Sequence, residues 1–110
     1  MEKRVIKIFI ITALIACGIT FYAQAEDLSV EQVEQQFSQA AITLKSGDTL
    51  HFVNKDTVTH NIQGINPEGA NNDKGLQAPG EESVHTFDEP GEYLIRCGIH
   101  PRMKLIVTVQ

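Results

Sequence analysis

The sequence predicts an all-β fold, an antiparallel sandwich or barrel built from six or seven short strands. Three observations support this prediction. Apolar and polar residues alternate in several short segments, turn-forming residues separate these segments at regular intervals, and the chain beyond its first 25 residues lacks a convincing helical period. A length of 110 residues indicates a single domain.

Residues 1–25 have the pattern of a cleavable export signal. A short basic start is followed by an apolar run over residues 8–22, and then by the small-x-small motif Ala23-Gln24-Ala25. An uncleaved membrane anchor is the first alternative, but a spanning helix needs about 20 apolar residues. We therefore expect a signal peptide over 1–25, a mature domain over 26–110 without a membrane span, and a periplasmic location.

A second alternative is lipid anchoring through Cys17. The segment Leu14-Ile15-Ala16-Cys17 resembles the bacterial lipobox, in which the cysteine is lipidated. Residues 19–22 directly after it are apolar and would make a poor polar tether.

The composition of the expected mature chain restricts its function. Its 13 acidic and 6 basic residues give a net charge near −7, which argues against nucleic-acid binding. A domain of 85 residues has a small core that usually needs additional stabilisation. Cys97 is the one cysteine after residue 25, so a disulfide within the chain is excluded. A lone cysteine in an exported protein is a reactive thiol or a metal ligand, and a metal would add stability.

The first half of the mature chain predicts three strands. Residues 28–36 are polar, with apolar residues at irregular positions, and we expect a ragged strand rather than a short helix. Residues 41–45 alternate weakly and end in the turn signal Ser46-Gly47-Asp48. Residues 49–54 alternate clearly, with Leu50 and Phe52 on one face.

The second half continues this pattern. Lys55-Asp56 predicts a turn, and residues 58–63 predict a strand that carries His60. Residues 64–80 are rich in Gly, Asn and Pro and predict a long loop. Strands are expected over residues 82–87, 92–97 and 104–109, with a tight turn at 88–91 and a loop at 98–103.

The segment with the clearest chemistry lies near the C-terminus. It places the thiol of Cys97, the imidazole of His100 and the thioether of Met103 within seven residues. Sulfur ligands favour copper, and imidazole suits copper or zinc, whereas Mg²⁺ and Ca²⁺ prefer oxygen ligands. A structural zinc site normally has four strong ligands, and methionine is not among them. These residues therefore predict a copper site.

A second imidazole is needed to complete two histidines and one cysteine around the metal. His60 is the best candidate, because it lies on a strand of the same predicted sandwich. His51 lies opposite Leu50 and Phe52 and is expected to be solvated, and His85 is expected to be half-buried. We assign neither of these two to the metal.

With these residues in place, the sequence resembles the cupredoxins, the small blue-copper proteins such as plastocyanin, pseudoazurin and especially amicyanin. The matching motifs are His60-Asn61 and the later Cys97-x2-His100-x2-Met103, whose short loop with Pro101 is typical of amicyanin. Residues 44–50, 54–56 and 87–93 match as supporting context, so the resemblance covers about 41–109.

The resemblance implies a Greek-key β-sandwich or barrel with one copper ion. A trigonal plane of His60, Cys97 and His100 would surround the ion. Met103 would be a weak axial ligand, and Asn61 would brace the ligand loop. The implied function is single-electron transfer between redox partners by Cu(I)/Cu(II) cycling, with exit through His100.

From this resemblance we expect the protein to be a monomeric carrier and not an enzyme. Its partner would be a redox protein of the cytochrome or dehydrogenase type, with an acidic rim that Arg102 and Lys104 would select. Periplasmic copper storage or delivery with the same ligands is the alternative.

Overall fold

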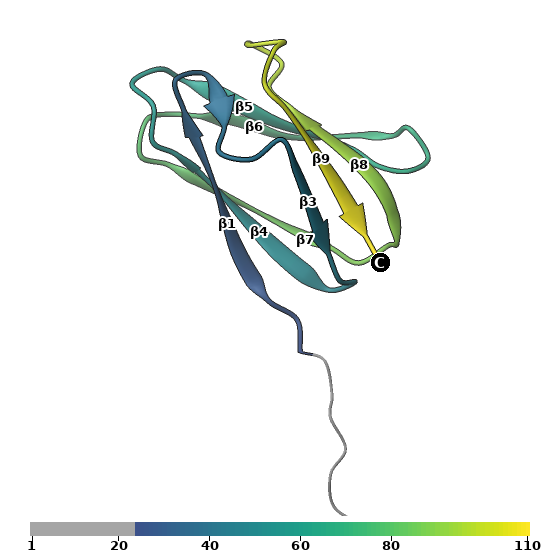
Figure 1. Cartoon of the computed structure of the whole chain (residues 1–110). Coiled ribbons are helices and arrows are strands. Elements are labelled where there is room, and N and C mark those ends of the chain that lie inside the picture. Colours follow the sequence, from purple (N-terminus) through teal and green to yellow (C-terminus); the bar gives the residue numbers. More distant parts are fainter. Residues whose placement is uncertain (1–23) are drawn as a thin grey trace, which may run out of the picture.

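The computed structural model describes residues 24–110, which form two β-sheets packed face to face (Figure 1). The first sheet has the order β2-β1-β4-β7, and the second has the order β3-β9-β8-β5-β6. The strands are β1 (Asp27–Val33), β2 (Gln36–Phe37), β3 (Ala41–Leu44), β4 (Asp48–Asn54), β5 (His60–Ile65), β6 (Asn71–Gln77), β7 (Glu82–Phe87), β8 (Gly91–Arg96) and β9 (Lys104–Val109). The all-β prediction is confirmed. Most of the predicted signal sequence, including Cys17, lies outside the described residues.

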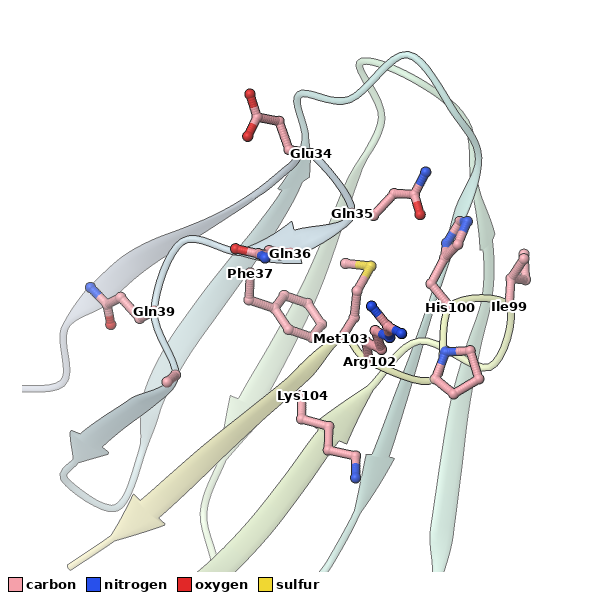
Figure 2. Close-up of a pocket in the computed structure, with 12 residues that line it drawn as sticks. Glu34, Gln35, Gln36, Phe37, Gln39, Ile99, His100, Arg102, Met103 and Lys104 are labelled. Carbon is pink, nitrogen blue, oxygen red and sulfur yellow. The ribbon is translucent and has the colours of Figure 1, made fainter.

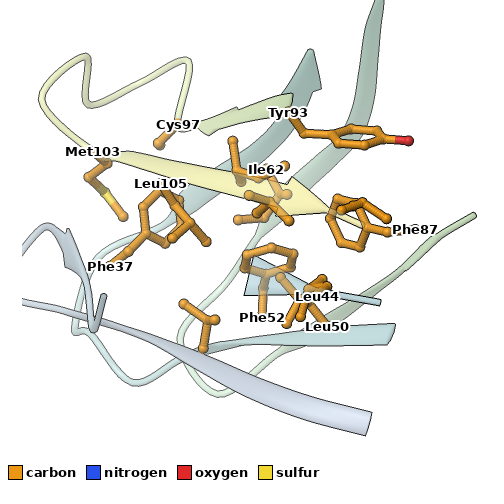
Figure 3. Packing of buried hydrophobic residues seen from close by; sticks show 14 residues of the cluster. Phe37, Leu44, Leu50, Phe52, Ile62, Phe87, Tyr93, Cys97, Met103 and Leu105 are labelled. Carbon is orange, nitrogen blue, oxygen red and sulfur yellow. The ribbon is translucent and has the colours of Figure 1, made fainter. Parts of the chain in front are cut away.

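Burial follows the predicted alternation. Leu50 and Phe52 of β4 are fully buried, whereas His51 between them is partly exposed. The same alternation along β8 and β9 brings the apolar side chains of one face of each strand into one core between the two sheets (Figure 3). No helix in residues 24–110 is long and apolar enough to cross a membrane.

The prediction of a long loop over residues 64–80 is wrong. Strand β5 extends to Ile65, and β6 pairs with it in antiparallel register. Six of the seven residues of β6 are exposed, and this strand lies at the edge of its sheet. Backbone hydrogen bonds hold such a strand, so its sequence lacks the apolar alternation that marks a half-buried one.

Two pairs of neighbouring strands are parallel, in contrast to the antiparallel pairing expected throughout. Strand β1 runs parallel to β4, and β3 runs parallel to β9. The chain leaves the first sheet after β2, contributes β3 to the second sheet and then returns as β4. This crossing makes parallel neighbours without a helix between them.

Asp48 joins the beginning of β1 to the turn before β4. Its carboxylate accepts hydrogen bonds from the backbone N–H of Glu26 and of Lys45, both at 2.8 Å. These two hydrogen bonds favour the ionised form and lower the pKa of Asp48. The N-terminal end of the described chain is therefore fixed to the sandwich.

The loop between β8 and β9, residues 97–103, lies at the end of the sandwich opposite the C-terminus (Figure 1). The tip of the β1–β2 hairpin lies at the same end, and the two segments line a pocket of about 560 Å³ (Figure 2).

Candidate metal centre

Cys97 follows the last residue of β8 and is 1% exposed. The inward direction that the alternation predicted is confirmed, because Cys97 belongs to the core cluster with Tyr93 and Ile95. The backbone N–H of Asn61 donates to its sulfur at 3.3 Å. This hydrogen bond helps to fix the position of the sulfur, and cysteine binds metals as the thiolate.

Two imidazoles converge on this sulfur. The Nδ1 atoms of His60 and His100 lie 4.0 and 3.7 Å from Sγ of Cys97, and they lie 3.0 Å from each other. His60 is fully buried at the start of β5, and His100 is partly exposed in the loop. The sequence places His60 and Cys97 far apart, and the hydrogen-bonded strands β5 and β8 bring them together.

The three separations fit a single metal ion. Typical bonds of about 2.0 Å to nitrogen and 2.3 Å to sulfur place two nitrogens about 3.5 Å apart, and a nitrogen and a sulfur about 3.7 Å apart, around one ion. The observed 3.0 Å between the two nitrogens, and 3.7 and 4.0 Å between nitrogen and sulfur, lie within about 0.5 Å of these values. The thiolate and the imidazoles are donors that suit copper. All three ligand atoms lie within 4.8 Å of one another, and the two most interior residues are buried. The site therefore has the size and the chemistry of a copper centre.

Met103 ends the loop and is 1% exposed. Its backbone N–H donates to the carbonyl of His100 at 2.9 Å, which closes the loop into a tight turn. Its side chain lies beside Phe37 in the wall of the pocket that also contains His100 (Figures 2 and 3). The thioether is thus held at the same end of the core as the other three predicted residues.

Asn61 connects the loop to the second sheet. Its side-chain oxygen accepts a hydrogen bond from the N–H of Gly98 at 3.1 Å. Its side-chain nitrogen donates to Asp73 at 2.8 Å and to the carbonyl of Gly75 at 2.9 Å. These contacts fix the orientation of the amide, so the loop is held in place by protein contacts alone. Asp73 was missed by the sequence analysis, because it falls in the segment predicted to be a loop.

Asp56 was also missed. Its Oδ2 atom lies 2.9 Å from Nε2 of His60, on the side of the ring away from Cys97. The sequence analysis assigned Asp56 only to a turn. An acidic residue four positions before a candidate ligand was the available signal, but turns commonly contain aspartate for unrelated reasons.

The other two histidines lie outside this cluster. His51 pairs on the surface with Glu82 and Asp27, and the hydrogen bond with Glu82 raises the pKa of His51. His85 is more buried than expected and stacks on Phe87 with the ring centroids 4.6 Å apart. Burial lowers the pKa of His85, since it disfavours the charged ring.

Comparisons with known proteins agree with this geometry. The sequence model of the copper-binding proteins of the plastocyanin/azurin family matches residues 24–110. Pseudoazurin of Methylorubrum extorquens is 31% identical over 107 residues, which cover 89% of this chain and 70% of that protein. Plastocyanin of Scenedesmus fuscus is 34% identical over 84 residues, which cover 67% of this chain and 86% of that protein.

A solved structure gives the same fold. The reduced state of an amicyanin variant superimposes with a TM-score of 0.70, covering 76% of this chain and 82% of that one. Its sequence identity of 23% supports the similarity of fold alone.

Proposed function

Since the chain belongs to the plastocyanin/azurin family of copper-binding proteins, we propose that it carries single electrons between redox proteins. The observation that carries this proposal is the convergence of one cysteine sulfur and two imidazole nitrogens at one end of the core. His60, Cys97 and His100 would hold the copper, and Met103 would be a weaker fourth ligand. Bound copper supplies a one-electron couple, Cu(I)/Cu(II).

The role of the protein residues is to keep the ligand positions constant. The N–H of Asn61 holds the sulfur, and its side chain holds the loop at Gly98. His60 is enclosed in the core, and Met103 closes the loop by its hydrogen bond to His100. Because these contacts are made within the protein, few atoms need to move when the charge changes.

His100 provides the route to the surface. It is partly exposed, and its neighbour Ile99 is 49% exposed. A small apolar surface suits the weak and brief docking of redox proteins. The proposed partner is a redox protein of the cytochrome or dehydrogenase type, and the proposed role is that of a monomeric carrier rather than an enzyme.

We also propose that residues 1–25 are removed on export and that residues 26–110 form the periplasmic domain. The basic start, the apolar run and the small residues before position 26 support this processing. Strand β1 begins at Asp27, so the proposed cleavage leaves every described strand intact.

Addition of Cu(II) to the purified domain tests the function. We expect an intense blue colour that bleaches on reduction and is absent in Cys97→Ala, because that variant lacks the thiolate. His85→Ala is the matched control, since it removes a histidine outside the cluster and should keep the colour. A metal-saturated wild type without colour would contradict the proposal. Ready transfer of copper to an apo-protein would favour copper delivery instead.

A further inference from the structure

Asp56 is the acidic residue in direct contact with the copper site. Its Oδ2 atom lies 2.9 Å from Nε2 of His60, and the two side chains are 13% and 0% exposed. Nδ1 of the same ring faces Cys97 and His100. The ring of His60 is therefore held between a carboxylate on one side and the metal position on the other.

The carboxylate of Asp56 is itself fixed by the backbone. Oδ2 accepts a hydrogen bond from the N–H of Gln35 at 2.8 Å, and Oδ1 accepts one from the N–H of Thr57 at 3.0 Å. Gln35 is at the tip of the β1–β2 hairpin and has a φ of 56°, which is uncommon for a residue other than glycine. The hairpin tip is thus tied to the turn that precedes His60.

This arrangement has two physical consequences. A carboxylate can accept a hydrogen bond but cannot donate one, so it favours the tautomer of His60 with the proton on Nε2 and a free lone pair on Nδ1. A fixed negative charge behind the ring also makes Nδ1 of the imidazole a stronger electron-pair donor to a metal. A ligand that donates its electron pair more strongly stabilises Cu(II) more than Cu(I), because Cu(II) has the larger charge.

We propose that Asp56 is a positioning residue that sets the tautomer of His60 and lowers the reduction potential of the bound copper. Only the claim about the reduction potential rests on the proposed function. The tautomer of His60 is a property of the metal-free protein, so the claim about the tautomer can be tested separately.

Nitrogen-15 NMR of the metal-free domain tests the tautomer. We expect His60 of the wild type to carry its proton on Nε2, and we expect Asp56→Ala to shift the ring toward a mixture of both tautomers. A wild-type ring protonated on Nδ1 would overturn the proposal, and it would do so even if the protein binds no copper.

Electrochemistry of the copper-loaded domain tests the potential. Asp56→Asn keeps the size of the side chain and removes its charge, so we expect Cu(II) affinity to fall about tenfold or more relative to Cu(I). For one electron this is a rise of about 59 mV. Asp56→Glu should keep the potential close to that of the wild type.

Glu34→Gln is the matched control, since it removes an exposed carboxylate from the same hairpin tip, and this carboxylate points away from His100 and Met103 (Figure 2). We expect a much smaller shift in this variant. A blue wild type whose potential is unchanged in Asp56→Asn, or equally changed in Glu34→Gln, would overturn the role of Asp56 while leaving electron transfer in place. A colourless wild type would instead contradict the proposed function.

Discussion

Arg102 is a positive charge beside the proposed electron exit. It lines the same pocket as His100 and Lys104, in a chain whose net charge is negative (Figure 2). We expect Arg102→Glu to slow oxidation of the reduced protein by ferricyanide, because reversing the charge repels the anion. Stopped-flow rates at several salt concentrations measure this effect. Attraction makes the rate fall as salt is added, and we expect this fall to be absent in the variant.

Lys45→Glu is the control for this experiment, since Lys45 directly follows β3, which ends at the end of the sandwich opposite the ligand loop (Figure 1). It makes the same change in net charge away from His100. Equal effects of the two variants would show that overall charge, rather than the position of Arg102, controls the encounter.

The contacts of His51 predict how the free energy of unfolding changes with pH. Its hydrogen bond with Glu82 raises its pKa in the folded protein, and Asp27 adds to the effect. The folded state therefore binds the proton more tightly than the unfolded state, whose pKa is about 6.5. This contribution is complete below about pH 6.5 and is lost as the pH rises through the higher folded pKa.

Urea unfolding between pH 5.5 and 9 measures this contribution. We expect the free energy of unfolding of the wild type to decrease over the alkaline part of this range more than that of His51→Gln. Parallel pH curves for the two proteins would be inconsistent with this role of His51.

At the scale of elements, the turn from β7 to β8 depends on Gly91. This residue has a φ of 137°, and a Cβ atom added to it would lie 2.5 Å from Cγ of Pro67. We expect Gly91→Ala to destabilise the domain by about 1–3 kcal/mol or more, since strain and a steric clash add together. The midpoint of thermal unfolding measures the loss.

Gly69→Ala separates these two causes. Gly69 also has a positive φ, of 84°, but no atom lies within 4 Å of an added Cβ. We expect the smaller loss that backbone strain alone produces, about 1 kcal/mol. A loss at Gly91 no larger than the one at Gly69 would exclude the clash with Pro67.

The elements differ in how far the sequence predicts them. Strand β4 alternates over its whole length because one face packs on the core, so its bounds and its inward face could be predicted. Strand β6 exposes six of its seven residues, so its sequence carries no comparable signal. The parallel pairs β1–β4 and β3–β9 join segments distant in the chain, and alternation within one strand carries no information about its neighbour.

The candidate site was predictable where its residues are close in sequence. The loop 97–103 contains three donors with a recognisable spacing, and His60 followed from the missing second imidazole. Asp56 and Asp73 were not predictable, because their roles depend on hydrogen bonds to side chains that the fold brings near. Residue type alone does not distinguish them from turn and surface aspartates.

At the scale of the whole molecule, copper should raise stability without being needed for the fold. The hydrogen bonds from Gly98 to Asn61 and from Met103 to His100 already hold the ligand loop within the protein. A ligand at 100 times its dissociation constant stabilises a protein by about 2.7 kcal/mol. For a domain of this size that corresponds to a rise in Tm of about 10 °C or more.

Differential scanning calorimetry with and without copper measures this difference. The metal-free domain should still unfold in one cooperative transition, and Cys97→Ala should show little change on adding copper. A metal-free domain without a cooperative transition would mean that the ligand loop and the core form only around the metal.

The contact between Asp48 and the backbone nitrogen of Glu26 has a consequence for maturation. In the full chain that nitrogen is a neutral amide, 2.8 Å from a carboxylate oxygen of Asp48. The proposed cleavage after Ala25 would turn it into a free α-ammonium group. Proteolysis would thereby convert an ordinary hydrogen bond into a charge-assisted one. The proposed mature domain would then hold its N-terminus more firmly than the full chain does.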